Sequence, residues 1–343
     1  MRAAVLRNGQ ITVRDDVQEA VPGPGQVLVQ VKACGICGSD LHFAKHGSDM
    51  LALGEQMEGV PARNREQLDL SRDVYLGHEF AGEVLEAGPD TEAPPTGTPV
   101  TAFPILLRAD GGIDPIVYSN RVHGGYGERM LLSAAMLLPV PNGLATDLAA
   151  LTEPMAVGLH AVNRSGIAQA EKAVVLGCGP VGLAVIAALK VRGVRSIVAA
   201  DYSPARRALA ATLGATEVVD PREETAWVRA GTAGPLVVFE AIGVPGILDE
   251  ILRYAPGQSR VVVVGVCMNT DAINPYFGIS KELSVQFVLG YTPEEFAASL
   301  HSIAEGDIDV APLVTARVGL DDVAWAFNAL ADPEEHCKII VEP

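Results

Sequence analysis

One segment, residues 173–201 with the sequence AVVLGCGPVGLAVIAALKVRGVRSIVAAD, constrains the fold more than any other part of the chain. It combines an apolar run of strand length, three glycines spaced G-x-G-x-x-G, an apolar run of helix length and a second β-branched run that ends in an acid. Glycine in such a turn allows close approach to a pyrophosphate, and the next helix offers free N–H groups at its start. The segment therefore predicts dinucleotide binding rather than a glycine-rich turn without a ligand.

The acid at the end of this segment indicates which dinucleotide is bound. Asp201 lies about twenty residues beyond the glycines, where a carboxylate accepts hydrogen bonds from an adenosine ribose. Because the same carboxylate would repel a 2′-phosphate, the sequence favours NAD over NADP. Arg206 either lies over the adenine or is simply an exposed arginine. The turn residues predicted to contact the cofactor are Gly177, Gly179, Pro180, Val181 and Gly182.

The two parts of the chain have different patterns. After residue 173, apolar strands alternate with helices, which predicts a doubly wound parallel sheet and an α/β fold. The first part is rich in β-formers punctuated by Gly and Pro, which predicts a β-rich lobe. We expect a catalytic domain from residues 1–150 and 293–343, and a nucleotide-binding domain from residues 151–292.

Composition excludes several classes of partner. The chain of 343 residues is 49% hydrophobic and carries a net charge of −17, so we expect neither nucleic acid nor an anionic membrane as a partner. No apolar run is long enough for a transmembrane helix, and the first residues lack the apolar region of a signal peptide. The five cysteines are odd in number and scattered, which favours free thiols or metal ligands. These features predict a cytoplasmic protein.

Two short motifs carry metal-ligand chemistry. The first, CGICGSDLH at residues 34–42, holds one C-x-x-C pair, and the chain has no second pair to complete a four-cysteine site. The second, LGHEFAGEV at residues 76–84, holds His78 and Glu79. A thiolate from Cys37 or Cys34 and a neutral imidazole are ligand types that Zn²⁺ favours, and a catalytic zinc keeps an open position.

These motifs together resemble the zinc-dependent medium-chain alcohol dehydrogenase family. The order C-G-I-C-G-S-D-L-H, G-H-E-F-A-G-E-V, G-G-Y-G-E and then the glycine turn covers nearly the whole chain, outside one insertion. The resemblance implies a GroES-like catalytic domain, a Rossmann domain and hydride transfer between NAD and a secondary alcohol or polyol. It is nearest to the polyol, sorbitol, butanediol and threonine dehydrogenase branch.

The resemblance also implies roles for the motif residues. Cys37 is the zinc thiolate, His78 the imidazole ligand, and Glu79 a direct ligand or a nearby carboxylate. Ser39 takes the proton of the substrate hydroxyl, His42 passes it to solvent, and Asp40 orients the zinc histidine. Glu153, in the motif E-P-x-A-V-G-x-H, reaches the zinc or its water; a capping acid is the alternative. Further cofactor contacts are implied at Gly243, Gly265, Val266 and, on weaker grounds, Lys338.

Other parts of the chain depart from the family or extend it. Residues 84–130 contain no cysteine, so we expect one catalytic zinc per subunit and no structural zinc. Residues 44–74 form an insertion, either a short helix and loop over the substrate cleft or an exposed elaboration. Residues 284–290 resemble an apolar edge strand, which predicts a homodimer or homotetramer. Two other functions remain open, namely a zinc-free reductase of enones or quinones and a non-catalytic NAD-binding protein.

Overall fold

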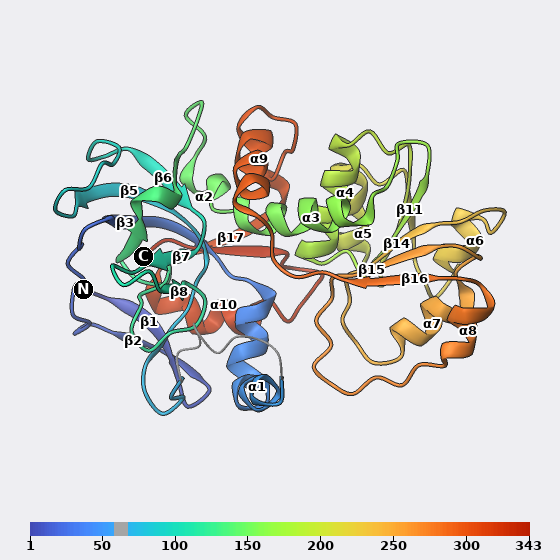
Figure 1. Cartoon of the computed structure of the whole chain (residues 1–343), viewed down its shortest axis with the longest axis horizontal. Helices are drawn as coiled ribbons and strands as arrows, with labels where there is room; N and C mark the ends of the chain where they lie inside the picture. The colour runs from blue at the N-terminus through green and yellow to red at the C-terminus, as the bar shows by residue number, and fades with distance from the viewer. Residues whose placement is uncertain (58–67) are drawn as a thin grey trace.

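The computed structural model describes residues 1–57 and 68–343, and these form two lobes, each built on its own sheet (Figure 1). The second lobe, on the right in Figure 1, carries the predicted parallel sheet, with strand order β13–β12–β11–β14–β15–β16. Every neighbouring pair in it is parallel. Its strands are β11 (Lys172–Leu176), β12 (Ser196–Ala200), β13 (Glu217–Val219), β14 (Val237–Glu240), β15 (Arg260–Val263) and β16 (Ser284–Phe287).

Both faces of this sheet are covered, which explains why its strands are almost continuously apolar. Val175 of β11 packs in one buried cluster with Leu183 of a covering helix, while its neighbour Val174 packs in another with Trp227 and Ile251. The α/β, doubly wound prediction is confirmed. The helices of this lobe are α3 (Thr152–Ser165), α4 (Pro180–Val191), α5 (Pro204–Leu213), α6 (Ala226–Ala230), α7 (Ile247–Tyr254) and α8 (Pro275–Ser280).

The first lobe is rich in strands, as expected. Its main sheet has the order β10–β6–β5–β3–β18–β17, with β9 also paired to β3, and a smaller sheet has the order β2–β1–β4. The strands are β1 (Ala3–Arg7), β2 (Gln10–Arg14), β3 (Gln26–Gly35), β4 (Val74–Tyr75), β5 (Glu79–Ala87), β6 (Pro99–Ala102), β7 (Ile105–Leu107), β8 (Ile113–Pro115), β9 (Arg129–Ser133), β10 (Leu137–Pro139), β17 (Val314–Val318) and β18 (Lys338–Val341).

The chain returns from the second lobe to complete the first. After β16 it forms α9 (Pro293–Ala304), β17, α10 (Val323–Ala329) and β18. Strand β18 lies between β17 and β3, with Ile340 opposite Gly35. This insertion places residues near 338 beside the end of β3, where the first of the two metal-ligand motifs begins.

Two segments that lead into the site are helical. Residues 147–161 divide between α2 (Thr146–Ala149) and α3. Pro154 lies in the first turn of α3, where its missing N–H has no helical acceptor to lose. In the insertion at 44–74, helix α1 (Gly38–Glu55) extends through the first part and β4 ends it, while residues 58–67 lie outside the described part of the chain.

Candidate active site

The glycine turn between β11 and α4 has the backbone that dinucleotide binding requires. Gly177 has a φ of +90°, which favours glycine, and a Cβ on Gly182 would lie 1.9 Å from the Gly177 carbonyl oxygen. A Cβ on Gly179 would meet nothing within 4 Å, so this side of the turn is open. Helix α4 begins at Pro180, and the N–H groups of its first turn have no partner within the helix.

Asp201 follows β12 directly and is tied to the glycine turn. Its Oδ2 accepts a hydrogen bond from the Cys178 N–H at 2.7 Å, and its Oδ1 accepts one from the Ser203 N–H at 2.8 Å. Each carboxylate oxygen keeps a further lone pair for a ligand hydroxyl. Arg206, in the next helix, has a buried Nε with no partner among the described residues. The open turn and this unpaired guanidinium nitrogen both fit an anionic dinucleotide.

Two later glycines, predicted as cofactor contacts, meet at the next strand ends. A Cβ on Gly265 would lie 2.4 Å from the Gly243 nitrogen, and one on Gly243 would lie 2.7 Å from the Val266 nitrogen. The buried Glu240 holds this crossing in place, because its Oε1 accepts hydrogen bonds from the N–H groups of Ile242 and Gly243, both at 2.7 Å. The crossing therefore tolerates only glycine at both positions.

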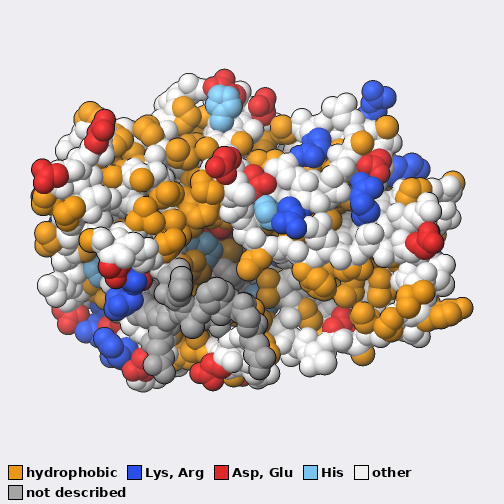
Figure 2. All heavy atoms as spheres, viewed as in Figure 1, with side chains coloured by type: hydrophobic (Ala, Val, Ile, Leu, Met, Phe, Trp, Pro, Cys, Tyr) orange, Lys and Arg blue, Asp and Glu red, His pale blue; other side chains and the backbone are white. Residues whose placement is uncertain are grey.

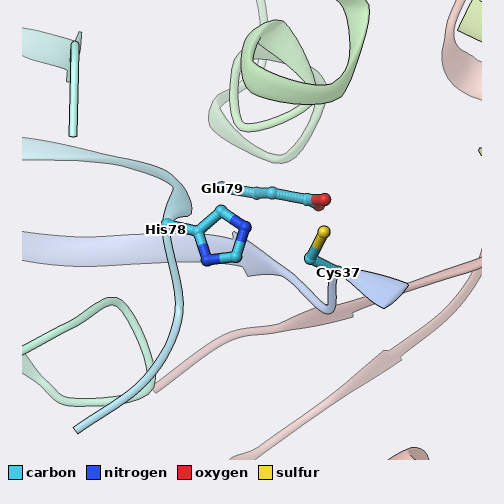
Figure 3. A group of neighbouring side chains, drawn as sticks. All are labelled: Cys37, His78 and Glu79. Carbon is cyan, nitrogen blue, oxygen red and sulfur yellow. The ribbon is translucent and has the colours of Figure 1, made fainter. Parts of the chain in front are cut away.

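The candidate metal ligands converge at the junction of the two lobes. One ligand atom from each of Cys37, His78 and Glu79 lies within 4.8 Å of the other two. Figure 3 shows the Cys37 sulfur and the Glu79 carboxylate facing each other beside the His78 ring. On the face shown in Figure 2, the molecule is hollowed between the lobes, with histidine side chains visible at depth.

The pairing of β3 with β5 explains this convergence. Gly35, at the end of β3, lies opposite Glu79, at the start of β5, and Cys37 follows two residues later as the N-cap of α1. A Cβ on Gly35 would lie 2.1 Å from Oε2 of Glu79. The absence of a side chain at Gly35 therefore leaves space for the Glu79 carboxylate. Cys34 points elsewhere; it is fully buried, and its sulfur would lie 2.5 Å from a Cβ on Gly125.

Glu79 is held by a buried ion pair that the sequence did not indicate. Nζ of Lys338 lies 2.7 and 2.8 Å from the two Glu79 carboxylate oxygens and donates to the Ile36 carbonyl oxygen at 3.0 Å. Burial would lower the pKa of Lys338, but the negative charges of Glu79 and Cys37 outweigh it and raise that pKa. These three contacts occupy the three N–H groups of the Lys338 ammonium. The expected contact between Lys338 and the cofactor remains a prediction.

Asp40 lies behind His78, as its expected orienting role requires. Its Oδ2 accepts hydrogen bonds from the Tyr126 hydroxyl at 2.6 Å and from the Cys37 N–H at 3.3 Å. Its Oδ1 and Nδ1 of His78 are buried, unpaired and 3.6 Å apart. An imidazole that binds a metal through Nε2 carries its proton on Nδ1, so a small rotation of the ring would satisfy both atoms.

Glu153 lies near this cluster, at the start of α3. Burial raises its pKa to about 7, and the negative charge of Glu79 adds to this while the positive charge of His78 opposes it. Its side chain is hydrogen-bonded to that of Tyr291, in the segment that joins β16 to α9. Tyr291 also packs on Phe296, with ring centroids 5.7 Å apart.

The electrostatics of the cluster favour a bound cation. Burial raises the pKa of the Cys37 thiol, and the charge of Glu79 raises it further. Burial would lower the pKa of His78, but the charges of Asp40 and Cys37 outweigh it and raise that pKa well above its usual value. The buried acidic side chains of this site therefore outnumber its two basic ones; the acids are Asp40, Glu79 and Glu153, and the bases are His78 and Lys338. A divalent cation would balance them, and a thiolate, an imidazole and a carboxylate form a donor set that suits Zn²⁺.

The two expected proton-transfer residues lie on α1. Oγ of Ser39 is 3.4 Å from Nε2 of His78, at the metal cluster. His42 is exposed, and its pKa is lowered by partial burial and by the positive charges of His46 and Lys45. A lowered pKa keeps this imidazole neutral, and able to accept a proton, near pH 7.

Three tyrosines of the site were not among the expected residues. Tyr126 bonds Asp40, Tyr291 bonds Glu153 and Tyr118 bonds Ser39. The sequence carries no local signal for any of these pairs, because each joins segments far apart in the chain. Tyr126 lies in the motif G-G-Y-G-E, whose glycines alone carry the resemblance to the family.

The chain is similar to known dehydrogenases over its whole length. Residues 23–142 match the family described as alcohol dehydrogenase GroES-like domain, and residues 180–305 match the family described as zinc-binding dehydrogenase. An (R,R)-butanediol dehydrogenase of Bacillus subtilis is 33% identical, with 100% of both chains covered. A sorbitol dehydrogenase of the same organism is 28% identical, covering 100% of this chain and 97% of its own.

Solved structures give the same picture of the fold. The crystal structure of 2R,3R-butanediol dehydrogenase from Bacillus subtilis superposes with a TM-score of 0.83 at 32% identity, covering 100% of this chain and 99% of its own. A zinc-binding dehydrogenase from Sinorhizobium meliloti, solved with NADP, has a TM-score of 0.81 at 27% identity, with 100% and 99% covered. Among the described residues, no helix combines the length and apolar character needed to cross a membrane.

Proposed function

The chain belongs to the zinc-binding alcohol dehydrogenase family with a GroES-like domain, and on that premise we propose that it oxidises a secondary alcohol or polyol with NAD. The observation that carries this proposal is the convergence of Cys37, His78 and Glu79 within 4.8 Å. Zn²⁺ and NAD(H) both fit the residues present. Because full-length relatives are named for butanediol and sorbitol, we propose a substrate with neighbouring hydroxyl groups.

We assign the metal donors first. Cys37, His78 and Glu79 would hold one zinc ion, and Glu153 would stand beside its open position. The ion pair with Lys338 supports a fixed Glu79, and the unpaired Nδ1 of His78 opposite Asp40 supports a histidine that is oriented once metal binds. When bound, zinc supplies the positive charge that acidifies the alcohol, and the nicotinamide accepts the hydride.

The proton is the part of the reaction that the side chains handle. Ser39, at the metal cluster, would accept the proton of the substrate hydroxyl, and His42, at the surface of α1, would deliver it to solvent. Asp201, the glycine turn and the unpaired Nε of Arg206 would bind NAD. The Asp201 carboxylate supports NAD over NADP because it would face a 2′-phosphate with like charge.

The direct test is metal analysis together with turnover. Purified protein should contain about one zinc per subunit and reduce NAD with 2,3-butanediol or a polyol. Protein without zinc that reduces enones or quinones would instead be a zinc-free reductase. Protein that binds NAD but turns over neither the alcohols nor the enones and quinones would be a non-catalytic NAD-binding protein. In that case the proposed reaction would be wrong.

We also propose a homodimer or homotetramer assembled through β16. This strand ends the order of the parallel sheet, and Phe287 and Leu289 on it and just beyond it are 69% and 89% exposed. Figure 2 shows hydrophobic side chains gathered over this part of the second lobe. Leu289→Asp combined with Phe287→Lys should yield monomers by light scattering; an unchanged mass would contradict this assembly.

The domain limits and the location are proposals of the same kind. We place the catalytic domain at residues 1–150 and 293–343 and the NAD-binding domain at 151–292, supported by the return of β17 and β18 to the first lobe. All five cysteines are free, which supports a cytoplasmic location. Expression of residues 151–292 alone, tested for NAD binding, checks these limits.

A further inference from the structure

The segment between β6 and β9, which carries Tyr126 as well as Tyr118, is fixed to the strand that leads into the second metal-ligand motif. The Tyr75 N–H donates to the Ser119 carbonyl oxygen at 2.8 Å, and the Ser119 N–H donates back to the Tyr75 carbonyl oxygen at 3.2 Å. Tyr75 belongs to β4, three residues before His78. This bridge places Tyr118 beside the short connection that leads into the second metal-ligand motif.

Tyr118 packs on the face of α1 that carries Ser39. Its ring stacks on that of Phe43, with centroids 3.9 Å apart and planes 7° apart. Ser39 and Phe43 are four residues apart on α1, so they lie on the same face of the helix. The Tyr118 hydroxyl forms a side-chain hydrogen bond with Ser39, whose Oγ lies 3.4 Å from Nε2 of His78.

The bonding capacity of Ser39 makes this contact useful. A serine hydroxyl has one hydrogen to donate and two lone pairs to accept with, and it rotates freely unless something fixes it. One bond to Tyr118 limits that rotation and leaves sites for the substrate oxygen and for the next proton acceptor. Burial and the negative charge of Asp40 raise the pKa of Tyr118, so its hydroxyl stays protonated.

We propose that the Tyr118 hydroxyl is a positioning group for Ser39, holding the serine so that its oxygen faces the metal cluster and proton transfer through it is efficient. This inference rests on the proposed function, since it takes Ser39 as the acceptor of the substrate proton. The proposal gives Tyr118, in the segment between β6 and β9, a role in proton transfer.

The test is Tyr118→Phe, which keeps the ring stack on Phe43 and removes only the hydroxyl. Zinc content, NAD affinity and melting temperature should match those of the wild type. We expect kcat to fall about fivefold, the usual scale for one lost hydrogen bond, with KM little changed. The loss should be equal for 2-butanol and 2,3-butanediol, and the solvent deuterium isotope effect on kcat should rise because the proton step has become slower. Tyr276→Phe, at an exposed tyrosine of α8, is the matched control.

Three outcomes would overturn the inference. A wild-type kcat and isotope effect in Tyr118→Phe would show that Ser39 needs no such support. A loss confined to 2,3-butanediol would show that Tyr118 contacts the second hydroxyl of the substrate instead. Equal losses from Tyr118→Phe in wild-type and Ser39→Ala backgrounds would show that the two residues act separately. Absence of zinc or turnover in the wild type would instead contradict the proposed function itself.

Discussion

The dinucleotide turn of the second lobe comes from one continuous stretch, β11 to Asp201, whereas the metal site at the junction of the lobes joins side chains from the start of α1, β5, α3 and β18. The geometry of the turn is set by its glycines and by the Asp201 carboxylate, which accepts hydrogen bonds from the adjacent backbone. The geometry of the metal site is set by buried charged side chains that pair with one another although they lie far apart in the sequence. The comparison teaches that the first site depends on local backbone geometry, and the second on the whole fold.

The largest effect should come from Cys37→Ser. Removing the thiolate should release zinc and lower kcat by at least about a thousandfold, since the metal contributes several kcal/mol to the barrier. NAD affinity should not change, because the glycine turn lies in the second lobe and contains none of the metal ligands. Zinc analysis, turnover and NAD titration check this, with Cys34→Ala as the control that keeps zinc. Activity that persists in metal-free Cys37→Ser would contradict the mechanism, and a loss of NAD affinity would break the comparison.

Lys338→Met should have the next largest effect, on stability. It leaves the buried Glu79 carboxylate without its partner, and breaking such a pair costs about 3–5 kcal/mol. Urea unfolding measures this loss. The double variant Lys338→Met/Glu79→Gln should recover part of it, because no buried charge is then left unpaired. Equal stability of the single and double variants would show that the ion pair does not carry the effect.

Asp201→Gly tests the locally built site. Loss of a charged acceptor should weaken NAD binding by about ten- to a hundredfold, while zinc content stays unchanged. Asp220→Asn is the matched control, because Asp220 follows β13 as Asp201 follows β12 but pairs with Arg207 and Arg222. Unchanged NAD affinity in Asp201→Gly would argue against its contact with the ribose.

The smallest effect should come from Glu295→Gln, at a residue with both local and distant partners. Glu295 forms a capping box with Thr292, and it also bonds His160 at 2.8 Å and Asn163 at 2.7 Å on α3. We expect a loss of about 1 kcal/mol near pH 7 by urea unfolding. Asn163→Ala is the companion variant, because it removes only one of the hydrogen bonds to Glu295. A larger loss of unfolding free energy in Asn163→Ala than in Glu295→Gln would contradict this assignment.

The pH dependence of this last contact follows from its charge. Burial would raise the pKa of Glu295, but hydrogen bonds from Asn163, the Thr292 N–H and His160 outweigh it and lower the pKa. A carboxyl group with a lowered folded-state pKa stabilises the protein above its unfolded pKa, and this contribution is lost as pH falls through the folded-state value. The gap between wild type and Glu295→Gln should therefore shrink below about pH 4. A gap that grows on acidification would contradict this sign.

The parts of the fold with local determinants are the parts that the sequence predicts in detail. The segment from β11 to Asp201 was predicted element by element, because strand, glycines, helix and acid follow one another directly. The motif residues Cys37, His78 and Glu79 were predicted as a group, and they converge. Zinc analysis and turnover of the Cys37→Ser variant test the predicted metal role of this group.

The contacts that the sequence does not predict depend on long-range packing. Lys338 and Glu79 are 259 residues apart, and Tyr126 and Asp40 are 86 residues apart, so no local pattern links them. Tyr118 lies in a segment whose strands, β7 and β8, have three residues each, too few to show a period.

The position of β18 has a consequence for how the protein is made. This strand lies between β3 and β17, yet it follows the entire parallel sheet in the chain. During translation, the second lobe can leave the ribosome and fold while the first lobe still lacks an inner strand and Glu79 lacks its countercharge. Zinc loading should therefore be a late event of biosynthesis, and a ribosome stalled before codon 338 should carry a nascent chain that already binds NAD but does not yet retain the metal.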